Sequence, residues 1–308
     1  MSELLDRIRD GQHTEPLRVL SKRHPVRNTI AILLLAWAGW ALYLISQNQR
    51  FKWDIVLEYL LAPPVMAGLV VTLWLTAISM AIGLALGMVL AVMANSENYV
   101  ISGTAALYVW FFRGVPLLVQ LVFFYNIAAL FPTIEIGIPG VFSIASLKSN
   151  AVITPTMAAI IGLGLNEAAF MSEIVRAGIA SVNPGQVEAA RSLGMSPTLH
   201  LTRVVLPQAM RVIIPPTANE TVNMLKTTSL VSVLAVTDLM YSVQQIYARN
   251  FQVIPLLIVA TIWYLVLTTV LTFGQSYLER IFSTRSRQIR GRQKESKGTP
   301  CLAAGDLQ

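Results

Sequence analysis

Polar side chains stand inside three long apolar stretches of the sequence. Asn166, Glu167 and Glu173 share one stretch, Gln120 lies in an earlier one, and a later one contains Lys226-Thr227-Thr228-Ser229. A carboxylate can hold an ammonium group or a cationic side chain, whereas a lysine with hydroxyls beside it can line a pocket or a gate. These residues are therefore the candidates for contact with a charged small molecule.

Patterns typical of catalysis or of metal binding are missing from the sequence. It has no G-x-x-x-x-G-K-[ST] phosphate loop, no H-E-x-x-H motif and no pair of cysteines, since Cys301 is the only one. The chain is therefore predicted to bind no metal or cofactor and not to be an enzyme on its own. Energy for any transport must come from a separate ATPase subunit or from an ion gradient.

The composition is that of a protein embedded in a membrane. The chain has 308 residues, of which 55% are hydrophobic and only 13% are charged, whereas soluble domains carry about 25% charged residues. Several apolar runs exceed the ~18 residues that cross the hydrocarbon of a bilayer. We therefore predict an all-α, polytopic helical membrane protein surrounded by lipid.

About six transmembrane helices are expected. The third apolar stretch, 101–131, is interrupted by Arg113-Gly114-Val115-Pro116, where a charge, a glycine and a proline should break the helix near the membrane surface. The loop after it contains Pro132, Gly137, Pro139 and Gly140. The predicted spans cover 28–47, 65–94, 116–131, 153–175, 212–236 and 252–273.

Lysine and arginine gather at both ends of the chain and in one internal segment. Seventeen of the 23 lie in residues 1–27, 176–211 and 276–308, and only four lie in the loops expected on the opposite side. Cytoplasmic segments carry such an excess, so both termini and residues 176–211 are predicted to be cytoplasmic. The same grouping speaks against a nucleic acid as partner.

Glu167 lies near the middle of the fourth predicted span. A carboxylate there costs about 2.5–3.5 kcal/mol on insertion scales, so such groups face a cavity or a partner. One hypothesis is that Glu167, next to Asn166, faces a translocation path and contacts the ammonium or cationic side chain of a substrate. The alternative is a buried structural pair with Lys226 of the fifth span.

Two other polar or small-residue patterns favour structural roles. Glu173 lies three residues before Arg176 near the end of its span, a spacing at which the two can form an ion pair. Gly83 and Gly87 form a G-x-x-x-G pattern, which permits close helix contact, either within the chain or at a subunit interface.

Residues 176–211 are expected to contain two short helices. Asn183-Pro184 supplies a cap and a first-turn proline, and Gly194 supplies a left-handed stop. A second start signal follows at Ser196-Pro197, and Pro207 is expected to mark the end of the second helix. Such a compact pair suits docking into a groove on another protein, although an ordinary capped loop would explain it equally well.

A resemblance to a known family favours the docking interpretation. Glu188-Ala189-Ala190, followed at fixed spacing by Gly194, Val204 and Leu206-Pro207, resembles the EAA motif of bacterial binding-protein-dependent import permeases. Val204 replaces the usual isoleucine. In that family this loop is the coupling helix, which fits a cleft of the ATP-binding subunit. The resemblance implies that role for Glu188, Ala189, Ala190, Arg191, Gly194, Leu206 and Pro207.

Further segments resemble the polar amino acid subfamily of these permeases. Residues 113–120 are similar to its RGTPLLVQ segment, with Val115 in place of threonine, and 173–179, 206–209 and 225–230 are similar to other segments of that subfamily. The resemblance implies a type I ATP-binding cassette (ABC) importer permease core of five helices within 65–278. The span at 28–47 is then an addition, flanked by a cytoplasmic tail (1–27), and 279–308 is a basic cytoplasmic tail.

The family also implies the function and the partners. The chain would be the permease subunit of an ATP-driven amino acid importer. ATP and Mg would sit on ATPase subunits, a second permease subunit, identical or related, would complete the path, and a periplasmic or extracellular binding protein would deliver the amino acid. The alternatives are a secondary transporter driven by an ion gradient, with Glu167 and Glu173 as coupling groups, and a membrane scaffold or receptor without transport.

Overall fold

The computed structural model describes residues 25–138 and 142–296 and divides into two compact units, residues 1–51 and 52–308. The first unit contains α2 (Pro25–Gln47) and a short 3-10 helix, η1 (Gln49–Phe51). Residues 29–47 of α2 are long and apolar enough to cross a membrane, and this stretch has no buried share. The helix coincides with the first predicted span.

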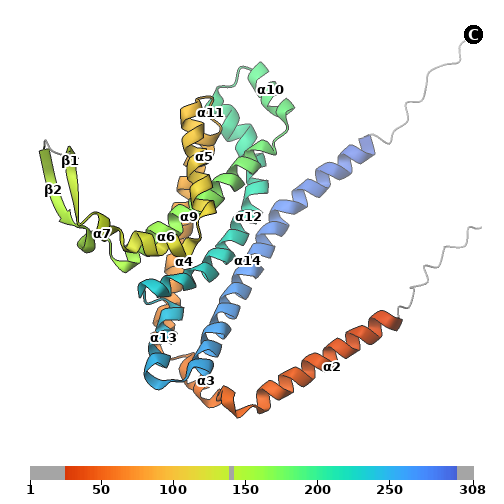
Figure 1. The fold of residues 1–308 in the computed structure, drawn as a ribbon. Helices are drawn as coiled ribbons and strands as arrows, with labels where there is room; N and C mark the ends of the chain where they lie inside the picture. The colour runs from red at the N-terminus through yellow and green to blue at the C-terminus, as the bar shows by residue number, and fades with distance from the viewer. Residues whose placement is uncertain (1–24, 139–141, 297–308) are drawn as a thin grey trace, which may run out of the picture. The chain divides into compact units, whose positions relative to one another are not determined.

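The second unit is helical apart from one hairpin (Figure 1). Its elements are α3 (Trp53–Leu60), α4 (Pro63–Ala94), α5 (Tyr99–Gly114), α6 (Leu117–Tyr125), α7 (Ile127–Leu130), β1 (Thr133–Ile138), β2 (Phe142–Lys148), α8 (Ser149–Val152), α9 (Pro155–Ala180), α10 (Pro184–Ser192), α11 (Pro197–His200), the π-helical turn η2 (Leu201–Val205), α12 (Leu206–Thr227), the 3-10 helix η3 (Thr228–Leu234), α13 (Leu239–Asn250) and α14 (Val253–Ser296).

Four helices of the described residues are long and apolar enough to cross a membrane, at 29–47, 63–94, 155–180 and 253–282. Helices α5 and α6 together make a fifth candidate, although they are bent by 100° at their junction. The predicted span at 212–236 corresponds to α12 and η3, whose polar side chains keep it out of this set. The expected all-α, polytopic class is confirmed, and α12 with η3 stands at the position of the remaining predicted span.

The third span differs from the prediction in its extent. The break falls at Val115 and Pro116, as expected, but α6 after it has only nine residues. Nine residues reach about 14 Å, less than half of a bilayer's ~30 Å hydrocarbon. The spanning element therefore includes α5, and a span limited to 116–131 is wrong.

Capping residues explain where the long helices begin. The Asn98 side chain accepts a hydrogen bond from the Val100 backbone amide at 2.9 Å and starts α5. Thr154 caps α9 in the same way, with Pro155 in the first turn. Proline is favoured there because its missing amide hydrogen has no partner in a first turn.

Helices α4 and α9 form the closest helix pair of the unit. A Cβ atom added at Gly87 would lie 2.5 Å from Cβ of Met171, and one added at Gly83 would lie 2.5 Å from Cγ of Glu167. The G-x-x-x-G pattern therefore brings α4 against α9 within one chain. The largest buried cluster surrounds this contact and includes Leu75, Met80, Leu121, Leu163, Met171, Met224, Val231 and Leu234.

A β-hairpin stands where the sequence suggests an irregular loop. Strands β1 and β2 pair antiparallel from Thr133–Lys148 to Ile138–Phe142, with a register shift between Ile136 and Gly137. Proline and glycine residues in 132–140 are typical of a turn, but they also flank hairpins. The correction concerns local structure only, since the hairpin leaves the helical core unchanged.

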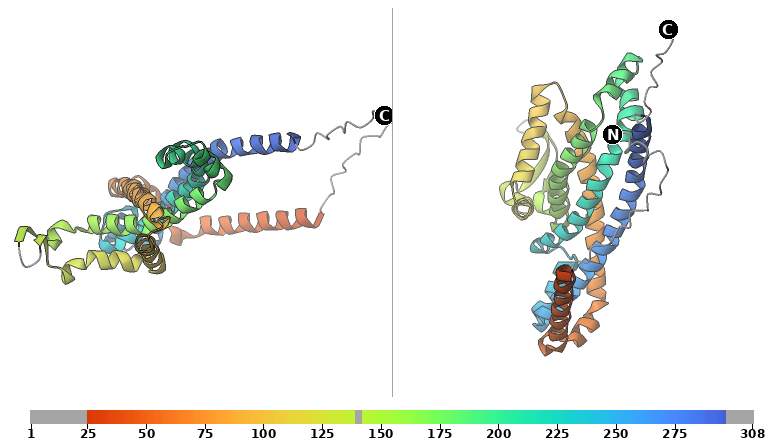
Figure 2. Two further views of the ribbon diagram at one scale, coloured as in Figure 1. Left: turned by 90° about the horizontal axis from the view of Figure 1, so that it is seen from above. Right: turned by 90° about the vertical axis from the view of Figure 1, so that its right-hand side faces the viewer.

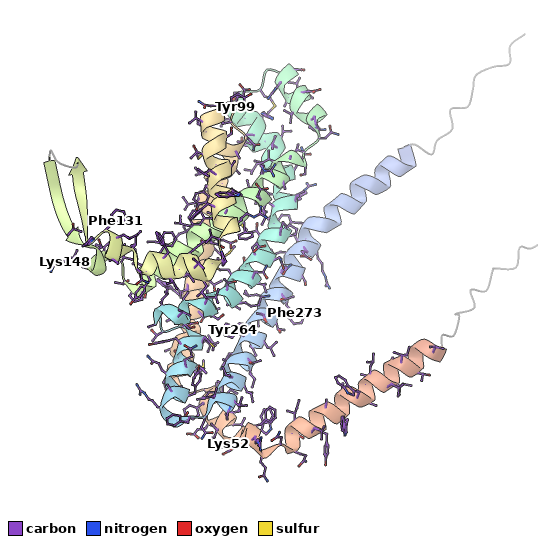
Figure 3. All side chains as sticks on the ribbon, in the orientation of Figure 1. Lys52, Tyr99, Phe131, Lys148, Tyr264 and Phe273 are labelled. Carbon is purple, nitrogen blue, oxygen red and sulfur yellow. The ribbon has the colours of Figure 1, made fainter. Side chains whose placement is uncertain are left out.

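The two ends of the second unit carry different elements (Figures 1 and 3). Tyr99, at the start of α5, lies at the end where α10 lies, whereas Lys52 lies at the opposite end, near α13. Helices α12 and α14 run beside each other between these ends (Figure 2). Helix α14 continues to Ser296, so the C-terminal part expected to form a tail from 279 begins as helix.

Candidate functional site

The knob, residues 183–205, comprises α10, α11 and the π-helical turn η2. The Asn183 side chain accepts a hydrogen bond from the Gly185 amide at 2.8 Å and starts α10. Gly194 has a φ of +72°, and the Met195 amide donates to the Ala190 carbonyl at 3.2 Å. Both predicted signals, the asparagine cap and the left-handed glycine stop, are confirmed.

The surface of the knob exposes most of the residues of the EAA motif. Glu188, Ala189 and Arg191 are exposed, whereas Ala190 is buried. Leu193, immediately before Gly194, is 83% exposed. Leu193 is therefore available for contact with another protein. Sequence reasoning missed Leu193 because the motif does not include it.

The knob is continuous with the long helix α12. Helix α11 passes through the π turn η2 directly into α12, and the Gln208 side-chain amide donates to the Val204 carbonyl at 2.9 Å. Pro207 lies in the first turn of α12, so the prediction that Pro207 ends the second helix is wrong. A proline has no amide to donate, and a wide π turn before it accommodates the missing hydrogen bond.

A polar face runs along α12. Asn219, Asn223 and Lys226 follow one another at spacings of four and three residues, so they share a face. Asn219 and Lys226 are exposed, and Glu220 and Asn223 are half-buried. The Asn223 amide nitrogen lies 3.5 Å from Oε2 of Glu220. The sequence prediction for this segment began only at Lys226. Asn219, Glu220 and Asn223 precede it at helical spacings of three or four residues and were not included.

The hydroxyls that follow Lys226 bond to their own backbone. Thr227 donates to the Asn223 carbonyl at 2.8 Å, Thr228 to Leu225 at 2.7 Å, and Ser229 to Lys226 at 2.7 Å. Hydroxyls in membrane helices commonly bond in this way. Their contribution to a path remains a prediction.

Glu167 is buried between helices. Its side chain is 4% exposed, it lies against Gly83 of α4, and its Oε1 has no hydrogen-bond partner. Within the described part of the chain, Lys226 forms no ion pair with it, so the alternative structural pair is not observed. Helix α12, which packs against α9, carries a second acid, Glu220. Contact of Glu167 with a substrate remains a prediction.

Gln120 and Asn166 meet at the bend between α5 and α6. The Gln120 amide donates to the carbonyls of Phe112 and Val115 at 2.9 and 2.8 Å. The Asn166 amide donates to the Phe112 carbonyl at 2.8 Å and approaches Oε1 of Gln120 at 3.4 Å. Two predicted path residues thus supply the donors that the broken helix lacks.

Glu173 and Arg176 form the expected ion pair. Their side chains approach to 2.6 Å and are 35% and 47% exposed, so the pair is partly solvated and adds little stability. It borders a cavity of about 590 Å³ between α5 and α9, which Ser172 and Ser102 also line.

A second cavity lies beside α12. It measures about 620 Å³ and is lined by α4, α9, α12 and α14, with Leu84, Val175, Met210 and Leu271 among its apolar walls. Thr217 and Thr221 of α12 also reach it. The cavity leaves space beside α12 along Thr217 and Thr221, and Glu220 is not among its lining residues.

Comparison with known proteins decides the class. Residues 83–283 match the family described as "Binding-protein-dependent transport system inner membrane component". The chain belongs to this family. It is a permease subunit of an ATP-driven importer, and ATP hydrolysis is the task of a partner subunit.

Relatives of the permease extend this match. The permease is 42% identical over 281 residues to the arginine transport system permease protein ArgU of Corynebacterium glutamicum. This alignment covers 91% of the chain and 87% of the relative. The permease is 38% identical over 210 residues to the nopaline transport system permease protein NocM of Agrobacterium fabrum, covering 68% of this chain and 84% of the relative.

A solved structure shares the fold. The crystal structure of an amino acid ABC transporter with histidines is 36% identical in sequence and has a TM-score of 0.60, covering 71% of this chain and 94% of that chain. The methionine transporter MetNI in an inward-facing conformation has a TM-score of 0.57 at 18% identity, covering 71% of this chain and 96% of that chain, which supports the fold alone. The type I importer core of the permease is confirmed, and the secondary-transporter alternative is excluded.

Proposed function

We propose that the permease forms the path of an importer for amino acids with cationic side chains. The importer carries amino acids and is driven by ATP. The observation that carries the narrower substrate class is the carboxylate of Glu220, which stands between Asn219 and Asn223 on the polar face of α12. The arginine permease of Corynebacterium glutamicum, 42% identical, supports the same class.

The polar face offers complementary groups to such a substrate. A carboxylate with amides beside it can hold a guanidinium or an ammonium group through charge-assisted hydrogen bonds. Lys226, two helical turns further along the same face, can hold the carboxylate of the amino acid. Glu167 lies behind this face and joins the path when α12 moves. Thr227, Thr228 and Ser229 follow Lys226 in the sequence. Glu173 and Ser172 border the cavity between α5 and α9.

The knob couples the path to ATP hydrolysis. Glu188, Ala189 and Arg191 with Leu193 present an exposed surface for a groove of the ATPase, whereas the buried Ala190 packs the knob itself. Gly194 fixes the turn, and Leu206 and Pro207 join the knob to α12. A displacement of the knob therefore moves the polar face directly.

The complete importer contains several chains. We infer two ATPase subunits that hold ATP and Mg, a second permease subunit, identical or related, and a soluble amino-acid-binding protein outside the membrane. The permease lies in the inner membrane with both termini and the knob in the cytoplasm, in agreement with the positive-inside rule. The apolar α2 crosses the same membrane.

The test is uptake by the full complex in liposomes, comparing wild type with Glu220→Gln. Arginine uptake should fall at least about tenfold, since a charge-assisted contact worth more than ~1.4 kcal/mol is lost. Uptake of glutamine, if measurable, should change much less. Glu97→Gln is the matched control, because Glu97 is exposed in the turn between α4 and α5. Equal arginine uptake by both variants would refute the proposed site.

A further inference from the structure

Glu167 is a carboxylic acid without a partner in the middle of a helix bundle. It lies midway along the 26 residues of α9, its side chain is 4% exposed, and Oε1 accepts and donates no hydrogen bond. Its methylene groups fill the space that a side chain at Gly83 of α4 would need. The close packing of α4 on α9 therefore keeps water away from Oε1 of this carboxyl group.

The surroundings of Glu167 offer no positive charge. Helix α4 presents Gly83 and, one turn earlier, Ser79, whose hydroxyl is also buried and has no partner. Helix α5 presents Tyr108, whose hydroxyl donates to the Leu165 carbonyl at 2.8 Å. Helix α12, which packs against α9, carries Glu220, a second and half-buried acid.

Two basic side chains of α5 and α12 have other surroundings. Arg113 lies over the ring of Phe170, 5.3 Å from its centroid, and Lys226 is exposed on α12. Among the described residues, no ion pair joins Glu167 to a basic side chain.

An ionised carboxylate in this position would be unstable. Removing a charge from water without a partner costs several kcal/mol, and a second carboxylate nearby adds repulsion. We propose that Glu167 is a proton-binding site, and that the bound proton allows α4, α9 and α12 to pack together as they do here.

The site is placed where the transport cycle can act on it. Helix α12 carries Glu220 and is continuous with the knob through η2, and the cavity of about 620 Å³ beside it gives the helix room to move. When α12 leaves α9, water reaches Glu167 and takes up its proton. The resulting carboxylate repels Glu220 and opposes closure until a cation or a proton returns. The inference is independent of the substrate class proposed above.

The test is the thermal unfolding of the purified full-length permease in its complex, measured as a function of pH. Wild type should lose stability as pH rises, because the ionised form of Glu167 is the one that burial disfavours. Glu167→Gln cannot ionise, so its midpoint should equal that of wild type at low pH and exceed it by several degrees at high pH.

Glu173→Gln is the matched control, and its effect on thermal stability should have the opposite sign. Glu173 is paired with Arg176 at 2.6 Å, so its ionised form is favoured, and the variant should be no more stable than wild type at any pH. In a Glu220→Gln background the gain from Glu167→Gln at high pH should shrink, because the repulsion is gone. Parallel profiles of wild type and Glu167→Gln, or a lower midpoint of Glu167→Gln at high pH, would overturn the proposal.

Discussion

Gln120 shows how one amide sets the shape of a broken span. Pro116 ends α5, and the 100° bend leaves carbonyls of its last turn without helical donors. The Gln120 amide donates to Val115 and Phe112. We expect Gln120→Leu to lower the free energy of unfolding by about 1–3 kcal/mol, the cost of a buried carbonyl left without a donor. Chemical unfolding of the purified permease measures it.

Asn126 supplies the control for this prediction. Its amide donates to the Val122 carbonyl at 2.8 Å, the same kind of contact, but the residue is exposed. Water replaces the donor there, so Asn126→Ala should cost much less. Equal losses for the two variants would mean that Gln120 does not stabilise the bend.

Side-chain contacts between residues close in sequence were predictable, whereas contacts between residues far apart in sequence were not. The Glu173–Arg176 pair follows from a spacing of three residues on one helix. The partner of Asn166 is the carbonyl of Phe112, 54 residues away, and only packing brings them together. Glu220 was missed because α12 is less apolar than the other spans, so one more polar residue in it did not stand out.

A glycine matters for helix packing only where a neighbouring helix comes close to it. At Gly87 an added Cβ would lie 2.5 Å from Cβ of Met171, whereas at Gly103 of α5 nothing lies within 4 Å. We expect Gly87→Ala to destabilise the permease by about 1–3 kcal/mol through overpacking. Gly103→Ala should be neutral or slightly stabilising, because alanine favours helix. Thermal unfolding of both variants tests whether the α4–α9 contact stabilises the fold, and similar midpoints would contradict it.

The junction of α11 and α12 explains an error at the scale of elements. Pro207 after a short helix was interpreted as its end, since proline cannot continue an ordinary helix. Proline is equally common in a first turn, and η2 lets α12 begin at Leu206 without a loop. The sequence contains no separate signal for a π turn. By contrast, Gly194 was predictable because its left-handed backbone favours glycine.

The whole molecule connects an exposed knob to a polar face inside the membrane. Leu193 lies at one end of a rigid path that runs through α10, α11 and η2 into α12, and it is 83% exposed. Full burial of an exposed leucine side chain contributes about 1.5–3 kcal/mol. Leu193 is therefore expected to be the main contact with the ATPase.

Leu193→Asp tests this connection in the native complex. The variant should lose the ATPase in a pull-down from detergent-solubilised membranes, since ~2 kcal/mol corresponds to about thirtyfold in affinity. Leu193→Met keeps an apolar side chain of similar size and should recover the ATPase like wild type. Both variants should insert equally, because the Leu193 side chain is exposed and not part of the buried core. If Leu193→Asp retained the ATPase at wild-type levels, the knob would have to bind through Glu188 and Arg191, and the apolar tip would have another partner.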